Sequence, residues 1–186
     1  MTTKKVMGIV AVVIAGGIGL FVFVLYATIK TKSTSLDQYE PFKEWVGKTV
    51  TLYGETVLFE EKVKMNSDPN YPYMLLDSLH PQWQYAEERQ HMPEPDLVKI
   101  TVFPAGTKLK IEKAIQYTNG VSGSSYPTVR GTIIQDGREY RMGYQWGHRD
   151  IGKAYDGIEK CWSFNQAPWQ TRQDTAYYAL PEAKLW

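Results

Sequence analysis

The chain has 186 residues, of which 21 are basic and 20 acidic, and its net charge at neutral pH is +1. This balance, without a basic patch, argues against nucleic acid as a partner. Hydrophobic residues make up 43% of the chain and six are tryptophan, which indicates a folded domain rather than a disordered one.

Residues 1–5 form a short tail, and residues 6–29 form a stretch of 24 residues without a charge. As a helix this stretch would be about 36 Å long, enough to cross a hydrocarbon layer of about 30 Å. The apolar part of a secretory signal is usually about 7–15 residues, and no small-x-small cleavage site follows at a suitable distance. The stretch also has no polar face for a soluble helix. We therefore expect an uncleaved single-pass membrane anchor rather than a cleaved signal.

The orientation of this anchor is poorly determined by its flanking charges. Lys4 and Lys5 precede it and Lys30 and Lys32 follow it, so the positive-inside rule gives a near tie. The short tail and the single cysteine, Cys161, favour a C-terminal domain outside the cytoplasm, because one thiol has no partner for mispairing in an oxidising compartment. We expect this domain in the periplasm.

Small residues recur along one face of the expected anchor. They are Gly8, Ala11, Ala15 and Gly19, at spacings of three, four and four. Small side chains let two helices approach closely in lipid. The pattern predicts a helix–helix contact, although glycine and alanine are also common in membrane helices that make none.

Beyond the anchor, residues 30–40 resemble a polar tether, and residues 41–186 a β-rich domain. Pro41 and Gly47 suit the two ends of a short helix over 41–46, in which Phe42 would pack on the core or near the membrane. Alternating apolar residues predict strands from residue 48, with a bulge at Gly54. Further strands are expected at 98–102, 108–117 and 158–164. In the strand expected at 108–117, Lys113 interrupts an apolar face.

The sequence "TVRGTIIQDGREYRMGYQW" has the strongest local pattern. Asp136-Gly137 fits a two-residue type I′ hairpin turn, in which both residues have positive φ. This register predicts three cross-strand pairs: Ile133 with Tyr140, Gly131 with Met142, and Val129 with Tyr144. These six residues and Trp146 then share one face.

The fold expected from these strands is mainly β: an N-terminal transmembrane helix, then a small antiparallel β-barrel or sandwich with short helical pieces. The segment "PAGTKLKI", residues 104–111, with the hairpin that follows it up to residue 146, resembles small bacterial SH3-like β-barrel domains. The resemblance implies a barrel, and such domains mostly bind peptides or cell-wall material.

Four residues carry chemistry that could serve a metal or an enzyme: His80, His91, His148 and Cys161. Their spacings match no standard zinc pattern, and we expect the histidines to be surface imidazoles, with no metal and no cofactor. Cys161 and His148 could act as a thiol nucleophile and its base. A lone cysteine in a strand is more often a small buried apolar residue. The sequence contains no GxSxG, HExxH, P-loop or dinucleotide-binding motif. We expect no enzymatic activity.

Two long loops are predicted, at 79–96 and 119–127, and a binding surface is expected between them. An exposed aromatic ring can stack on a sugar or anchor a partner. The candidate binding residues are Trp83, Tyr85, Tyr126, Trp169 and Trp186. We expect Trp146 and Trp162 in the core.

The function expected from these features is that of a membrane-anchored, non-catalytic binding or assembly component of the cell envelope. Its partners would be the lipid bilayer, other membrane or envelope proteins, and further copies of the same chain in an oligomer. Nucleic acid is not expected as a partner. Two alternatives remain open. One is an envelope cysteine hydrolase or transferase that uses Cys161 and His148, and the other is a cell-wall glycan-binding module.

Overall fold

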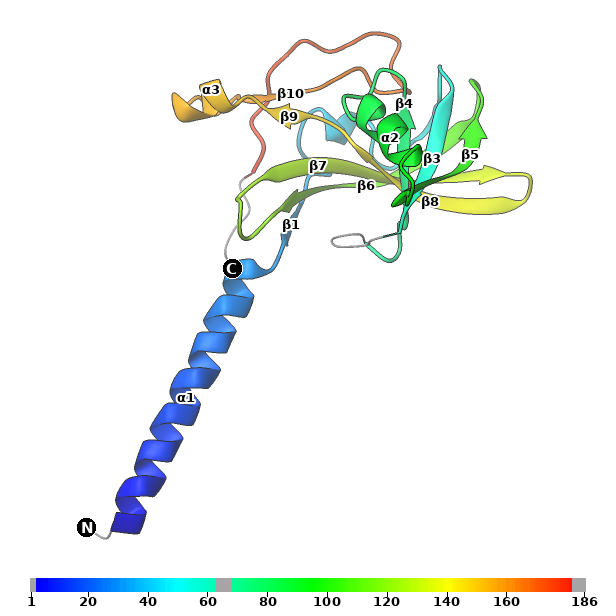
Figure 1. Cartoon of the computed structure of the whole chain (residues 1–186). Helices are drawn as coiled ribbons and strands as arrows, with labels where there is room; N and C mark the ends of the chain where they lie inside the picture. The colour runs from blue at the N-terminus through cyan, green and yellow to red at the C-terminus, as the bar shows by residue number, and fades with distance from the viewer. Residues whose placement is uncertain (1–2, 63–67, 182–186) are drawn as a thin grey trace.

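The computed structural model describes residues 3–62 and 68–181. A single long helix, α1 (Thr3–Ile29), projects from a β-rich domain (Figure 1). Its large apolar side chains are exposed, and the part from Lys5 to Ile29 is long and apolar enough to cross a membrane, a test that a signal sequence also passes. The predicted helix is confirmed.

Most of the domain is one sheet of eight strands in the order β1-β6-β7-β8-β4-β3-β5, with β2 paired to β6 as well. The pairs are antiparallel except β4 with β8. The strands are β1 (Lys32–Ser35), β2 (Thr49–Thr51), β3 (Thr56–Glu61), β4 (Tyr73–Asp77), β5 (Leu97–Phe103), β6 (Lys108–Thr118), β7 (Ser125–Gln135) and β8 (Arg138–Gln145). The two end strands, β1 and β5, do not pair with each other in the described chain, so the sheet is open. The predicted, mostly antiparallel β fold is confirmed, but the sheet does not close into a barrel.

A second sheet pairs only β9 (His148–Arg149) with β10 (Trp162–Ser163). The strand predicted at 158–164 is therefore reduced to two residues. Three short helices complete the fold: η1 (Phe42–Glu44), α2 (Trp83–Gln90) and α3 (Ile151–Tyr155). The first confirms the predicted short helix, and Gly47 follows it with φ +84°, as a helix-ending glycine does.

Part of the segment predicted as a polar tether, residues 30–40, belongs to the sheet as β1. Lys32 pairs with Thr118 and Ser35 with Ile115, and the next residue, Leu36, is fully buried. Only Lys30 and Thr31 separate α1 from β1. The helix therefore continues almost directly into the sheet.

The hairpin of β7 and β8 forms as the sequence predicts. Asp136 has φ +52° and Gly137 φ +74°, which suits the expected turn, and all three predicted cross-strand pairs are present. The turn chemistry and the side-chain alternation are local, and both favour the same register.

The strand predicted at 108–117 is confirmed as β6, but two details of the strand predictions are wrong. In β6 the register shifts between Ile111 and Lys113, so Glu112 is an extra residue and the side chains that follow change faces. Lys113 therefore lies opposite the core, and Ala114 is buried. At Gly54 there is no bulge. The chain there leaves β2, which pairs with β6, and enters β3, which pairs with β4 and β5.

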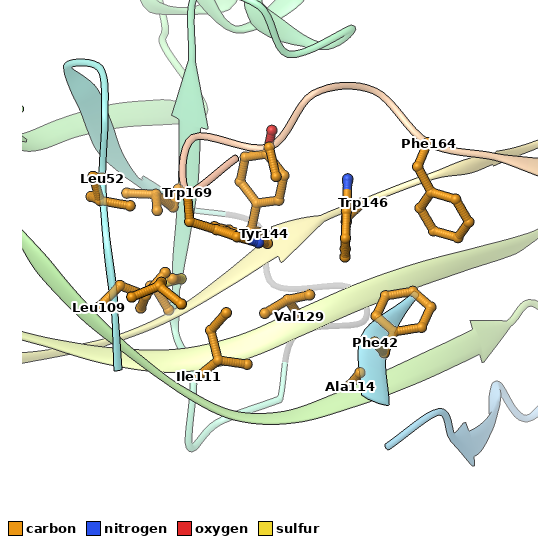
Figure 2. Packing of buried hydrophobic residues seen from close by; sticks show 14 of the residues in the cluster. Phe42, Leu52, Leu109, Ile111, Ala114, Val129, Tyr144, Trp146, Phe164 and Trp169 are labelled. Atoms are coloured by element: carbon orange, nitrogen blue, oxygen red, sulfur yellow. The ribbon is translucent and has the colours of Figure 1, made fainter. Parts of the chain in front are cut away.

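The main core is built around Trp146, which is fully buried (Figure 2). Its ring makes edge-on contacts with Phe42, Phe164 and Trp169, at centroid distances of 5.4, 5.1 and 5.4 Å. The indole Nε1 of Trp146 donates to the carbonyl of Asn165 at 2.8 Å, which satisfies its only polar atom. The prediction of Trp146 and Trp162 as core residues is confirmed.

A smaller apolar cluster lies under α2, a helix within the predicted 79–96 loop. The buried members are Val57, Phe59, Leu76, Ala86 and Leu97. Because α2 buries only Ala86 completely and has a mostly polar sequence, it lacks the apolar periodicity that predicts a helix. The loop prediction is therefore wrong for Trp83–Gln90.

Candidate functional site

A cavity of about 660 Å³ opens beside the ends of β6 and β7, and we call it the helix-proximal cavity. Its walls come from the ribbon formed by β6 and β7, from the α3 region and from the last part of the described chain. The lining includes Gln116, Thr118, Gly123, Cys161, Trp162 and Ala179. A volume of this size is within the range of small-ligand pockets.

The cavity is close to the end of α1 because the β6–β7 loop, residues 119–124, packs on that helix (Figure 1). A Cβ on Gly120 would lie 2.3 Å from the carbonyl oxygen of Thr28, 2.7 Å from that of Lys30 and 2.8 Å from that of Ile29. Only glycine permits this approach. The same loop contributes Gly123 to the cavity wall.

The wall of the cavity combines apolar surface with hydrogen-bonding groups. Gln116 is 2% exposed, and its amide Nε2 donates to the carbonyl of Pro181 at 3.1 Å. Its Oε1 accepts no hydrogen bond from any described residue. Cys161 and Trp162 are each 4% exposed and line the same wall. The lining therefore combines apolar and polar residues, as small-ligand pockets do.

The opposite face of the β6–β7 ribbon carries a buried cation. Arg130 is 8% exposed, and its guanidinium lies over the rings of Tyr71 and Tyr117, 5.6 and 5.4 Å from their centroids. The guanidinium also covers Gly143 on β8, where a Cβ would lie 2.2 Å from Nη1. Aromatic faces compensate part of the desolvation of a buried cation.

Glu112 and Tyr71 extend this group of residues. The Tyr71 hydroxyl donates to Glu112 at 2.6 Å, and Thr132 donates to the same carboxylate at 3.1 Å. Burial opposes ionisation of Glu112, but these hydrogen bonds, together with the charges of Arg141 and Lys110, lower its pKa. Burial, then the bond to Glu112, raises the pKa of Tyr71 to about 12. We call these residues the Arg130 group: Arg130, Tyr71, Tyr117, Glu112 and Thr132. The group is tightly hydrogen-bonded, as a structural network is.

The structure places the predicted aromatic binding residues in three separate regions. Tyr126 adjoins the Arg130 group: its ring stacks on Tyr117 at 5.7 Å, and burial raises its pKa. Trp83 packs edge-on against Phe59 in the smaller cluster, at 6.4 Å.

The other predicted binding residues do not come together in one site either. Tyr85 is 58% exposed on α2, with Arg89 above its ring, whereas Trp169 is 2% exposed within the main core. Trp169 therefore offers no accessible ring. Trp186 lies outside the described residues. The cavity is lined by the second predicted loop and by none of residues 79–96, so the predicted binding surface between the two loops stays a prediction.

Cys161 and His148 are not hydrogen-bonded to each other. The Nε2 of His148 lies 3.1 Å from the hydroxyl of Ser163, its cross-strand neighbour, and the His148 ring has no carboxylate partner in the described parts of the chain. Cys161 is buried and His148 exposed. Sequence reasoning missed the Ser163–His148 pair, because it depends on how β9 and β10 align.

His80 is buried, so its prediction as a surface imidazole is wrong. Its Nε2 lies 2.7 Å from the carbonyl oxygen of Gln145, and its Nδ1 accepts from the backbone N–H of Gln82 at 3.1 Å. Burial lowers the pKa of His80. His91 is exposed, as expected. Within residues 3–62 and 68–181, no three His, Cys, Asp or Glu residues are placed to hold a metal ion.

The small residues of α1 face outward. A Cβ on Gly8 or Gly19 would meet no other described atom within 4 Å. The predicted helix–helix contact of this face stays a prediction.

Comparisons of the chain with known protein families, with curated proteins and with solved structures find no match.

Proposed function

We propose that this chain is a single-pass membrane protein of the cell envelope that binds a partner or ligand, without catalysis, in the helix-proximal cavity. α1 is the membrane anchor, and the β domain lies outside the cytoplasm. The proposal rests above all on one observation: an exposed apolar helix ends two residues before the sheet that carries the cavity.

The geometry of the junction supports a role close to the bilayer. A helix whose large apolar side chains are exposed to solvent is unstable in water, because the apolar area that water contacts is unfavourable. Lipid removes this cost. The short connection and the contact of Gly120 with the helix end then hold the cavity next to the membrane.

The anchor is tested by fractionating cells that express the full chain. We expect it in the membrane fraction after alkaline carbonate extraction, and in solution only after detergent is added. A matched variant, Ile14→Arg with Val13→Arg, places two charges in the middle of the span and should reduce membrane insertion. Recovery of the unaltered chain in the soluble fraction without detergent would contradict the proposal.

The cavity is tested by gentle detergent extraction and identification of what co-purifies. Ala179→Trp would fill part of the cavity from an exposed position on its wall. Ala105→Trp, in an exposed turn that does not line the cavity, is the matched control. We expect one partner or ligand to be retained by the unaltered chain and by the control, and to be lost from Ala179→Trp. Equal retention by both variants would show that the cavity does not bind it.

A further inference from the structure

The β6–β7 loop carries an exposed apolar residue at its tip. Val121 is 75% exposed. The loop around it is ordered by its own hydrogen bonds, since the side chain of Asn119 accepts from the backbone N–H groups of Val121 and Ser122 at 2.8 and 3.0 Å. The backbone of Asn119 also pairs with Ser124 and Gly123, at 2.9 Å each. Val121 is therefore presented by a structured turn.

This turn is level with the end of the apolar span. The span ends at Ile29, where Tyr26 and Lys30 provide the aromatic and basic side chains that typify a membrane–water boundary. The Lys30 ammonium lies 5.7 Å from the centroid of the Tyr26 ring. Gly120, the neighbour of Val121, packs on the carbonyls of residues 28–30. A bilayer crossed by α1 would therefore have its surface at this loop.

We propose that the β6–β7 loop docks on the lipid surface of the same bilayer, with the Val121 side chain at the boundary between headgroups and hydrocarbon. This inference rests on the proposed anchoring of α1. The partner is lipid, because the loop carries one small apolar side chain at the depth where α1 enters the membrane. Together, helix and loop would give the domain two points of attachment and so one orientation, with Gly123 and the adjoining cavity wall beside the headgroups.

The sheet offers a matched control for this contact. Ile134 is 70% exposed near the C-terminal end of β7, next to the turn with β8. That end of the hairpin lies far from α1 (Figure 1). The two residues are similar in exposure and apolar character, and they differ in their distance from α1. A contact due only to surface hydrophobicity would involve both positions equally.

The test uses the full chain in vesicles of phosphatidylcholine and phosphatidylglycerol, with single nitroxide labels. The variants Val121→Cys, Ile134→Cys and Ile14→Cys are each made with Cys161→Ala, and their unfolding midpoints are compared first. Power-saturation spectroscopy measures collisions of each label with oxygen, which concentrates in lipid, and with a water-soluble nickel complex. We expect the oxygen-to-nickel ratio to be highest at 14, intermediate at 121 and lowest at 134.

The three labels separate the two proposals. Low ratios at 121 and 134 with a high ratio at 14 would overturn lipid docking while leaving the anchor intact. A low ratio at 14 would overturn the anchor and the docking with it. A label at 121 that meets neither oxygen nor nickel is covered by protein, and this result also overturns lipid docking.

Discussion

Gly120 in the β6–β7 loop and Thr28 in the last turn of α1 are in direct contact, although more than 90 residues separate them. The Cα of Gly120 faces the three carbonyls that close the helix. Carbonyls at the end of a helix have no hydrogen-bond partner within that helix. Because Gly120 has no side chain, its backbone can approach them closely. This contact determines how the domain is placed relative to the helix.

The variant Gly120→Ala should weaken this junction. Its Cβ would overlap backbone oxygen atoms, which move less readily than a side chain, and we expect a loss of about 1–3 kcal/mol in the free energy of unfolding. The measurement is chemical unfolding of the full chain in detergent micelles. Gly54→Ala is the matched control, because its Cβ would meet no described atom within 4 Å and its φ is not positive. Equal stability of the two variants would show that the contact is not tight.

Stability should decrease on the acid side of neutrality because of His80. The Nδ1 of His80 already accepts an N–H, so a proton there would remove that hydrogen bond. Burial lowers the pKa of His80 below its ordinary value of 6.5. Between those two pKa values the unfolded chain binds a proton that the folded chain does not, so stability is complete above pH 6.5 and decreases as the pH falls toward the folded pKa.

The expected loss is about 1.4 kcal/mol for each unit by which the folded pKa is lowered. It is measured by urea unfolding between pH 5 and pH 8, and the variant His80→Gln should be less stable at pH 8 but should lose the pH dependence. His91→Gln, at an exposed histidine, should keep it. Asp77 acts in the opposite direction, since burial raises its pKa and its folded form is favoured by acid. The same slope in His80→Gln and in the unaltered chain would exclude His80 as the cause.

The variant Tyr71→Phe should destabilise the Arg130 group. It removes a 2.6 Å hydrogen bond to the Glu112 carboxylate, and we expect a loss of about 1.5–3 kcal/mol at pH 7. Because the pKa of Glu112 is lowered, its stabilising effect is present above pH 4.5 and is lost as the pH falls through the folded value. Tyr71→Phe should therefore also show a smaller loss of stability in acid. Unfolding curves at pH 7 and pH 4 measure both effects.

The control for that experiment is Tyr53→Phe. Tyr53 is 59% exposed, and its hydroxyl makes no hydrogen bond with the residues that the structure describes. We expect a change within about 0.5 kcal/mol for this variant. If both tyrosine variants behave alike, the Glu112 bond contributes no net stability.

Local sequence patterns predicted the parts of the fold that depend on neighbours in the chain. The β7–β8 hairpin followed from Asp136-Gly137 and the alternation around it, and α1 followed from its apolar length. The bulge at Glu112 could not be predicted from local patterns, because a bulge is defined by how the strand pairs with its neighbour. The helix α2 was missed because its burial depends on a cluster supplied by β3, β4 and β5.

The candidate site shows the same limit. The predicted hairpin register gives Val129 and Gly131 to one face, which places Arg130 between them on the other face, and Arg130 does lie there. The sequence did not indicate its burial, because the covering residue, Tyr71, is 59 positions away in the chain. The helix-proximal cavity joins segments from Tyr39 to Pro181, and no local pattern predicts that combination.

The reactivity of Cys161 distinguishes the non-catalytic function from the cysteine-enzyme alternative, because the two predict opposite results. A catalytic thiol would react rapidly at neutral pH with reagents of many sizes. Cys161 is 4% exposed, so we expect slow reaction with a bulky maleimide in the folded chain and fast reaction after unfolding. A small reagent such as methyl methanethiosulfonate can enter the cavity. Its reaction with Cys161 should therefore be slowed less by folding than the reaction of the bulky maleimide. Val121→Cys, made with Cys161→Ala, supplies the exposed thiol for comparison.

The cavity-filling variant Ala179→Trp completes this experiment. If the small reagent reaches Cys161 through the cavity, Ala179→Trp should slow its reaction, whereas Ala105→Trp should leave the rate unchanged. Equal rates in both would show that the reagent arrives by local unfolding instead. Rapid reaction with the bulky maleimide, together with loss of a measurable activity in Cys161→Ser, would contradict the non-catalytic function and favour a cysteine enzyme.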